Sequence, residues 1–197
     1  MKEGQVHMSD PPVSTLQVSI KHFTALLDRC QWPLYTFLRG MVGDDEQALD
    51  LMQDTFYDAW RTAQQGNPPF DRGSAEEAGM RRWLFHAAYN RACSALRRRR
   101  IISWLPLESS TRDTVEDGSF EDQIAERQAV HAALASLSPV DASCLLLIVV
   151  HGFTAAEVSQ IVGASPEAVA KRFSRARQRL RDAYFAQNVQ PEMRSRS

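Results

Sequence analysis

The side chains best suited to chemistry lie on one face of a predicted helix near the carboxyl end of the chain. At about 100° of turn per residue, Val169, Phe173 and Leu180 form an apolar stripe together with Ala176. The opposite face carries Glu167, Lys171, Ser174, Arg175 and Gln178, with Arg172 and Arg179 on one shoulder and Arg177 on the other. Ammonium, guanidinium and amide groups bind phosphates and base edges. The pattern therefore favours a DNA-binding face over a merely solvated charged helix.

Signals before this helix predict the element that positions it. Thr154 and Glu157 have the spacing of a capping box, in which each side chain binds a free amide at a helix start. Gly163 can adopt the left-handed conformation that ends a first helix. Ser165 then caps the second helix, and Pro166 occupies its first turn. A helix-turn-helix of this layout delivers its second helix into the major groove of duplex DNA.

A second candidate surface is acidic and lies on the predicted helix from Asp45 to Gln65. Its apolar side contains Ala48, Met52, Thr55, Phe56 and Ala59, while Asp50, Asp54, Tyr57 and Arg61 lie opposite, flanked by Gln47, Gln53 and Asp58. The apolar side is expected to face the core. The acidic side has two interpretations, an ordinary solvated face or a docking surface for a basic protein partner.

A third candidate surface is the polar side of the predicted helix from Met80 to Arg100. It carries Arg82, His86, Asn90, Cys93, Arg97 and Arg100 with Trp83 at its edge, opposite Leu84, Ala87, Ala88 and Ala95. Cations beside an aromatic ring suit single-stranded nucleic acid, because phosphates meet the cations and an unstacked base can lie on the ring. Arginines at a helix end also interact with the helix dipole. Trp83 taken alone is more typical of a core residue than of a stacking platform.

The whole chain of 197 residues predicts an all-α fold with two small helical domains and a flexible linker between them. The first domain spans residues 16–100, with helices over 16–27 and 33–42 before the acidic helix. The linker spans residues 101–120. The second domain spans residues 121–186 and ends in the helix-turn-helix. The apolar run 145–150 has no partner strand nearby, so a buried helix is the favoured interpretation.

Composition limits the remaining classes. Net charge is −1 and 44% of residues are apolar, which fits a folded protein rather than a disordered one. The charge is segregated: residues 166–197 carry eight Lys/Arg against three Asp/Glu, a net of +5, and residues 101–123 carry one against six, a net of −5. Three widely spaced cysteines indicate no disulfide framework or zinc site. The longest apolar run is shorter than the roughly 20 residues that cross a bilayer. We expect a cytoplasmic protein without membrane insertion, metal or other cofactor.

Three segments resemble, in order, the extracytoplasmic-function (ECF) group of bacterial RNA polymerase sigma factors in the sigma-70 family. Residues 43–61, GDDEQALDLMQDTFYDAWR, resemble the signature of that group. Residues 83–92 and the arginine run after them resemble its promoter-melting helix. Residues 168–180 resemble its carboxy-terminal recognition helix. The resemblance covers about residues 16 to 185.

The resemblance implies three sets of contacts. The acidic helix would bind the clamp of the largest catalytic subunit of core RNA polymerase through Asp50, Gln53 and Asp54. The loop 70–79 and the helix after it would grip the −10 promoter element and hold a flipped base through Trp83, Asn90, Arg97, Arg98 and Arg100. The recognition helix would read the −35 element as duplex DNA through Ser165, Glu167, Lys171, Arg172, Ser174, Arg175 and Gln178.

Further implied partners are the flap of the second-largest polymerase subunit and a separate anti-sigma factor, while the acidic linker would thread toward the active-site and RNA-exit channels. The implied function is a sigma factor without catalytic residues that directs promoter-specific initiation. The main alternative is a stand-alone helix-turn-helix regulator, which would bind duplex operators without polymerase and leaves the acidic helix unexplained. An enzyme and a decoy that binds polymerase but not promoter are two further alternatives. No nucleophile motif or phosphate loop favours the enzyme.

Overall fold

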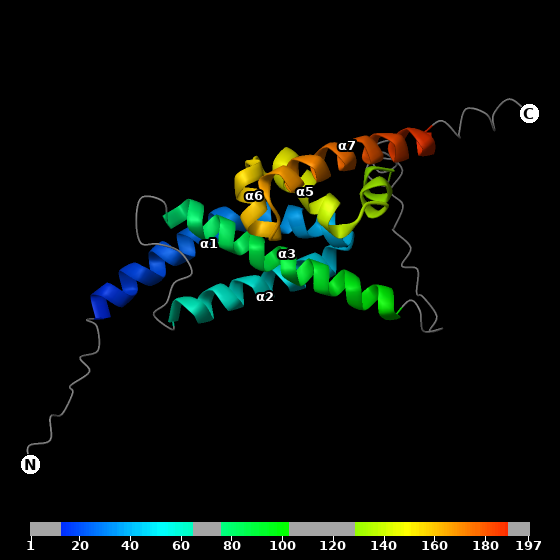
Figure 1. The fold of residues 1–197 in the computed structure, drawn as a ribbon. Coiled ribbons are helices and arrows are strands. Elements are labelled where there is room, and N and C mark those ends of the chain that lie inside the picture. The colour runs from blue at the N-terminus through cyan, green and yellow to red at the C-terminus, as the bar shows by residue number, and fades with distance from the viewer. Residues whose placement is uncertain (1–12, 65–75, 103–128, 189–197) are drawn as a thin grey trace, which may run out of the picture.

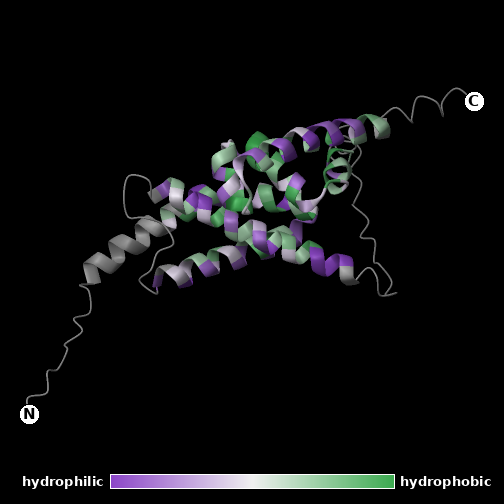
Figure 2. Ribbon diagram, viewed as in Figure 1, coloured by the Kyte–Doolittle hydropathy of each residue, from purple (hydrophilic) through white to green (hydrophobic). Residues whose placement is uncertain are grey.

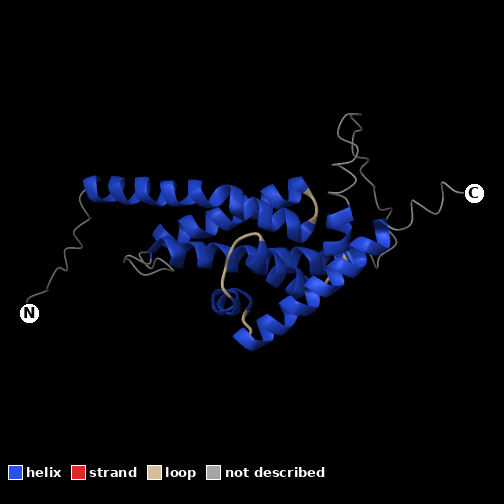
Figure 3. Ribbon diagram, turned by 90° about the horizontal axis from the view of Figure 1, so that it is seen from above, coloured by secondary structure: helices blue, strands red, loops and turns tan. Residues whose placement is uncertain are grey.

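The computed structural model describes residues 13–64, 76–102 and 129–188, and these segments contain helices and turns but no strand (Figures 1 and 3). The helices are α1 (Val13–Val42), α2 (Asp45–Gln64), α3 (Glu76–Ile102), α5 (Pro139–Val149), α6 (Ala155–Val162) and α7 (Pro166–Asn188). Residues 129–135 are also helical. The all-α prediction is confirmed. The predicted linker falls, except for its first two residues in α3, outside the described residues, as does most of the loop 70–79.

The predicted break before Pro33 is wrong, because α1 is one continuous helix with this proline inside it. Proline lacks an amide proton and crowds the preceding turn, which costs a helix about 3 kcal/mol. Leu34, Phe37 and Leu38 follow it at once, and all three are fully buried. Burial of large side chains stabilises by about 1.5–3 kcal/mol each, so core packing outweighs the local penalty.

A first unit consists of α1, α2 and α3, each of which contacts the other two. Gly43, with a φ of 78°, follows the end of α1. Asp44 caps α2, since its Oδ1 accepts a hydrogen bond from the amide of Gln47 at 2.7 Å. Ala48, Thr55 and Ala59 are fully buried on the predicted apolar side of α2. The acidic side of α2 is therefore turned outward.

A second unit consists of the helix 129–135 and α5, α6 and α7, and its caps match the predicted ones. The capping box of Thr154 and Glu157 is formed in both directions, and Gly163 is left-handed with a φ of 70°. Ser165 Oγ accepts from the amide of Ala168 at 3.2 Å. Ser138 caps α5, the apolar helix that is buried within this unit. The helix-turn-helix is thus held by local bonds that its own sequence specifies.

The two units pack directly on one another. α5 contacts α1 and α3, and α6 contacts α3. The buried residues form one hydrophobic cluster that runs through both units. In Figure 1, α5, α6 and α7 lie over α1 and α3, with α2 on the far side. Figure 2 shows hydrophilic residues along α7 and at the carboxyl end of α3, with apolar residues gathered on α5 in the interior. The linker is therefore not the sole connection between the units.

Candidate nucleic-acid interface

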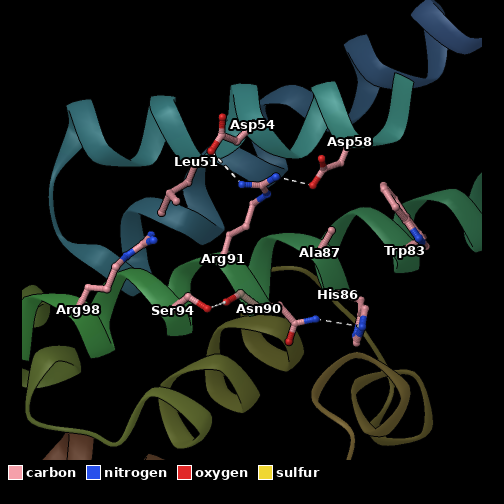
Figure 4. A pocket seen from close by; sticks show the side chains of 10 residues that line it. All are labelled: Leu51, Asp54, Asp58, Trp83, His86, Ala87, Asn90, Arg91, Ser94 and Arg98. Carbon is pink, nitrogen blue, oxygen red and sulfur yellow. Dashed lines mark hydrogen bonds and ion pairs between the residues drawn. The ribbon is translucent and has the colours of Figure 1, made fainter. Parts of the chain in front are cut away.

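A shallow pocket runs along α3 on the side that meets α2. Its volume is about 430 Å³, within the range of ligand sites in proteins. The residues that line it are Leu51, Asp54, Asp58, Trp83, His86, Ala87, Asn90, Arg91, Ser94 and Arg98 (Figure 4). The lining combines the Trp83 ring, the Asp54 and Asp58 carboxylates, two arginines and several hydrogen-bonding groups. An aromatic ring with a cation on the same helix is a combination that suits an unstacked base.

The pocket unites three of the five residues predicted to contact the −10 element. Trp83 is half-buried and packs on the core with part of its ring. Asn90 is exposed, and Arg98 lines the end of the pocket toward the carboxyl end of α3 (Figure 4). Arg97 and Arg100 are exposed on the same helix but do not line the pocket. Trp83 therefore packs on the core and also lines the pocket, while stacking of a base on its ring stays a prediction.

His86 is a pocket residue absent from the predicted contacts, although it shares their helix face. Its Nδ1 lies 2.7 Å from the carbonyl oxygen of Ile161 in α6. A carbonyl only accepts, so Nδ1 carries the proton and Nε2 is left to accept. Asn90 Nδ2 donates to that Nε2 at 3.0 Å. The amide of Asn90 is thereby oriented by a ring that is itself fixed by the second unit.

Arg91 ties the acidic helix to α3. Its Nη1 donates to Asp54 Oδ2 at 2.8 Å and its Nη2 to Asp58 Oδ2 (Figure 4). Its side chain is only 29% exposed, whereas that of Asp54 is 62% exposed. The periodicity of each helix does not reveal this pair, because the partners lie on different helices. The Arg91 guanidinium of α3 consequently holds the Asp54 carboxylate in one position on the acidic face of α2.

The acidic face of α2 is open to solvent at all three positions predicted to bind polymerase, Asp50, Gln53 and Asp54. Two apolar side chains lie among them: Leu49 is 43% exposed and Tyr57 is 64% exposed. Leu49, Gln53 and Tyr57 are four residues apart and form one stripe on the helix surface. The face thus offers apolar contact and carboxylates together, which suits a partner helix with basic and apolar side chains.

The outer face of α7 is exposed at Lys171, Ser174, Arg175 and Gln178. Arg175 Nε donates to the carbonyl of Lys171 at 3.3 Å. Ser165 and Glu167 lie exposed at the amino end. The pKa of Glu167 is lowered by hydrogen bonds from its own amide and from the Ser165 hydroxyl. This carboxylate therefore stays charged at neutral pH.

Arg172 differs from its neighbours because it turns inward. Its Nη1 donates to Asp141 Oδ1 of α5 at 3.2 Å, and the Asp141 side chain is only 11% exposed. Arg179 approaches the other oxygen of Asp141 at 3.7 Å. These contacts hold α7 on α5, which is a scaffold role distinct from the DNA contact predicted for Arg172.

Other chemistry has little support in the described part of the chain. No group of three or more His, Cys, Asp or Glu side chains there could hold a metal ion. Burial raises the pKa of the Cys144 thiol to about 11, far from that of a reactive thiolate. No described helix has the length and apolar content that a membrane span requires.

Comparison with known proteins gives a consistent family. The family model described as sigma-70, region 4, matches residues 127–180. The chain is 30% identical over 165 residues to ECF RNA polymerase sigma factor SigG of Mycobacterium tuberculosis, a match that covers 71% of this chain and 42% of SigG. It is 27% identical over 194 residues to ECF RNA polymerase sigma factor SigE of Mycolicibacterium smegmatis, covering 93% of this chain and 72% of SigE. The chain thus spans about two fifths of the length of SigG.

Solved structures agree with these matches. The sigma factor RpoE in complex with the anti-sigma factor NepR from Bartonella quintana has a TM-score of 0.60 at 25% identity and covers 85% of this chain and 96% of its own. CnrH in complex with the cytosolic domain of CnrY has a TM-score of 0.61 at 23% identity, over 84% of this chain and 89% of its own, and supports the fold alone. The capped helix-turn-helix, the region 4 match and the named relatives agree: residues 127–180 match region 4 of the sigma-70 family, and the chain is similar to ECF RNA polymerase sigma factors.

Proposed function

We propose that this protein is a dissociable subunit that binds core RNA polymerase and directs initiation at promoters with a −10 and a −35 element. The observation that carries the proposal is the exposed polar face of α7, on a fully capped helix-turn-helix within the region 4 match. Lys171, Arg175 and Gln178 would contact duplex DNA, and Arg172 would hold the helix in place. The protein itself would have no catalytic role.

The pocket on α3 would receive an unstacked base of the non-template strand. Trp83 would offer a ring face, Asn90 a base-edge partner and Arg98 a phosphate contact, which is the usual division of labour in single-strand binding. Extruding a base costs a few kcal/mol, and these contacts exist only after extrusion. Binding therefore favours the melted promoter over the closed duplex.

The exposed face of α2 would dock on the polymerase clamp through Asp50, Gln53 and Asp54. Docking would fix both units near the promoter, so that each raises the effective concentration of the other. A separate anti-sigma factor is a further proposed partner, supported by the structural neighbour RpoE, which was solved in complex with the anti-sigma factor NepR. These partners place the proposed site of action in the cytoplasm.

The direct test is promoter-dependent transcription with purified core polymerase and this protein as the only specificity subunit. A transcript that starts at a defined position and disappears when the −35 element is scrambled is expected. A stand-alone regulator would instead bind its duplex site equally tightly with and without polymerase. Absence of any specific transcript from a promoter library would reject the proposed function.

A further inference from the structure

We propose that His86 is a positioning residue that sets the base preference of the pocket. It holds the Asn90 amide so that the free oxygen of this amide selects a base with an exocyclic amino group. Adenine and cytosine would be preferred, and guanine and thymine, which carry a carbonyl oxygen at the corresponding position, would be disfavoured. This inference rests on the proposed function, since it takes the pocket to receive an unstacked base of the promoter.

One face of α3 forms the wall against which a base would lie. Trp83, Ala87 and Asn90 follow one another at intervals of four and three residues, the spacing of side chains on one helix face. All three line the pocket (Figure 4). Along the helix axis, at about 1.5 Å per residue, Trp83 and Asn90 are about 10 Å apart. Ala87 lies between them and has a small side chain. A base against the Trp83 ring would therefore turn its edge toward Asn90.

His86 offers the Asn90 side chain a hydrogen-bond acceptor. Its Nδ1 donates to the Ile161 carbonyl at 2.7 Å, so the neutral ring presents the lone pair of Nε2. Asn90 Nδ2 donates to this lone pair at 3.0 Å. With the amide turned the other way, its oxygen would face Nε2, and two acceptors form no hydrogen bond. His86 and Asn90 are one helical turn apart in α3, so the helix itself brings them together.

The orientation of the Asn90 amide decides which of its atoms is free to bind a ligand. Figure 4 shows the amide nitrogen on the side of His86 and the oxygen turned away from it. Ser94 donates to the backbone carbonyl of Asn90 and not to the amide. No described residue donates a hydrogen bond to Asn90 Oδ1, and the side chain is exposed. The free group is therefore a carbonyl oxygen, which only accepts.

The free oxygen separates the four bases into two classes. The exocyclic amino groups of adenine and cytosine are donors, whereas the exocyclic oxygens of guanine and thymine are acceptors. An amino base would therefore form a hydrogen bond with Asn90 Oδ1, and a carbonyl base would place two acceptors against each other. One good base contact discriminates by about fivefold or more. An amide without a fixed orientation would turn to suit either class and lose this discrimination.

The first experiment measures base preference in the complex of core polymerase with this protein. Single-stranded oligonucleotides of the non-template −10 sequence compete for binding, with each of the four bases placed at each position in turn. At one position, adenine and cytosine should bind about fivefold or more tightly than guanine and thymine. Purine, which lacks the amino group of adenine, should lose most of this advantage there. Equal binding of adenine and purine at every position would overturn the proposal.

The second experiment changes the partner of the Asn90 amide. His86→Glu supplies only acceptors, at the same number of bonds from Cα as Nε2 of histidine, and should keep the preference for amino bases. His86→Arg supplies only donors, so the Asn90 oxygen should turn toward it and leave the amide N–H groups for a carbonyl base. The preference should then shift by about fivefold or more toward guanine and thymine. An unchanged preference in His86→Arg would show that His86 does not position the amide.

A double variant separates positioning from direct readout by the new arginine. His86→Arg combined with Asn90→Ala should show no preference between amino and carbonyl bases at this position. A preference for guanine that persists in the double variant would mean that the arginine itself reads the base, and the His86→Arg result would then count against the proposal.

Charge and folding have their own controls. Ala25→Arg adds the same guanidinium to an exposed position of α1, outside the pocket, and should leave the ratio between bases unchanged. His86 is exposed, so circular dichroism and the melting temperature of its variants should match those of the unchanged protein. Absence of promoter-dependent transcript from every variant and from the unchanged protein would refute the proposed function. A complex that transcribes but binds all four bases equally at every position would refute this inference alone.

Discussion

Two arginines of α7 that are three residues apart, Arg172 and Arg175, have different environments. Arg172 binds the nearly buried Asp141 of α5, whereas Arg175 is exposed and its Nε donates to the carbonyl of Lys171. The same residue type thus serves the scaffold at one position and remains available to a ligand at the other. The difference follows from the direction in which each side chain leaves the helix.

Arg175→Ala should weaken binding of the polymerase complex to promoter DNA by about 1–3 kcal/mol if the guanidinium reads a base. The melting temperature should stay unchanged, because the side chain is exposed. Competition binding with promoters altered at single −35 positions measures the effect. Arg177→Ala is the control, since Arg177 lies on the shoulder of the helix over the Phe173 ring. Equal loss for both variants would indicate non-specific attraction only.

Arg172→Ala should instead lower the free energy of unfolding by about 1–2 kcal/mol. The substitution removes one of the two arginines that contact the nearly buried Asp141 carboxylate. The expected loss of stability is modest because the Arg172 side chain is 38% exposed and Arg179 still lies near Asp141. Urea denaturation of Arg172→Ala and Arg172→Lys measures the loss. The stability of the lysine variant should lie between that of the unchanged protein and that of Arg172→Ala. A stability equal to that of the unchanged protein would show that Arg172 is not a scaffold residue.

At the scale of elements, features that depend on neighbouring residues could be predicted from the sequence. The caps at Thr154, Ser165 and Asp44 need only side chains three residues from their partners, and all three are formed. Pro33 was predicted wrongly because burial of α1 overrides a local penalty. The second buried stripe of α3, Phe85 and Tyr89, faces the other unit, so the periodicity of α3 alone could not reveal what it contacts.

Gly163→Ala should destabilise the protein by about 1–2 kcal/mol, the cost of a left-handed backbone for a residue with a Cβ. Sterics do not contribute, since no heavy atom lies within 4 Å of the added Cβ. Gly163→Asn should cost less, because asparagine tolerates this conformation. Chemical denaturation of both variants measures the difference. Equal costs would show that the turn between α6 and α7 does not depend on this backbone angle.

At the scale of the whole molecule, each of the three histidines with described side chains lies where the two units meet. His86 binds the carbonyl of Ile161, His131 covers Gly43, and His151 lies between Phe37 and Phe85. These contacts join parts of the chain on either side of the segment 103–128. No local pattern could predict them, which is why the sequence indicated two units but not their contact.

Burial, and next the Arg81 guanidinium, lower the pKa of His151 to about 4 while the two units are packed together. Burial, then Arg39 of α1 and Arg99 of α3, also lower the pKa of His131. The pKa of Glu157 in α6 is lowered by the Thr154 amide and hydroxyl ahead of Arg82 and Arg81. Separated units would return both histidines toward their ordinary pKa of about 6.5. The neutral histidine rings therefore favour packing of the two units, and protonation of these rings favours separation of the units.

Packing of the two units on one another should accordingly be strongest above pH 6.5. It should weaken as the pH falls from 6.5 toward 4, by at most about 2 kcal/mol at pH 5 for His151 alone. Small-angle scattering at pH 7.5 and pH 5 measures it as an increased radius of gyration. His151→Phe should remove most of this increase, because phenylalanine cannot take up a proton and fits the same aromatic site. Carboxylates that titrate near pH 5 are common to both proteins and cancel in the comparison. An equal expansion of both proteins at pH 5 would show that the acid-sensitive groups lie outside this contact.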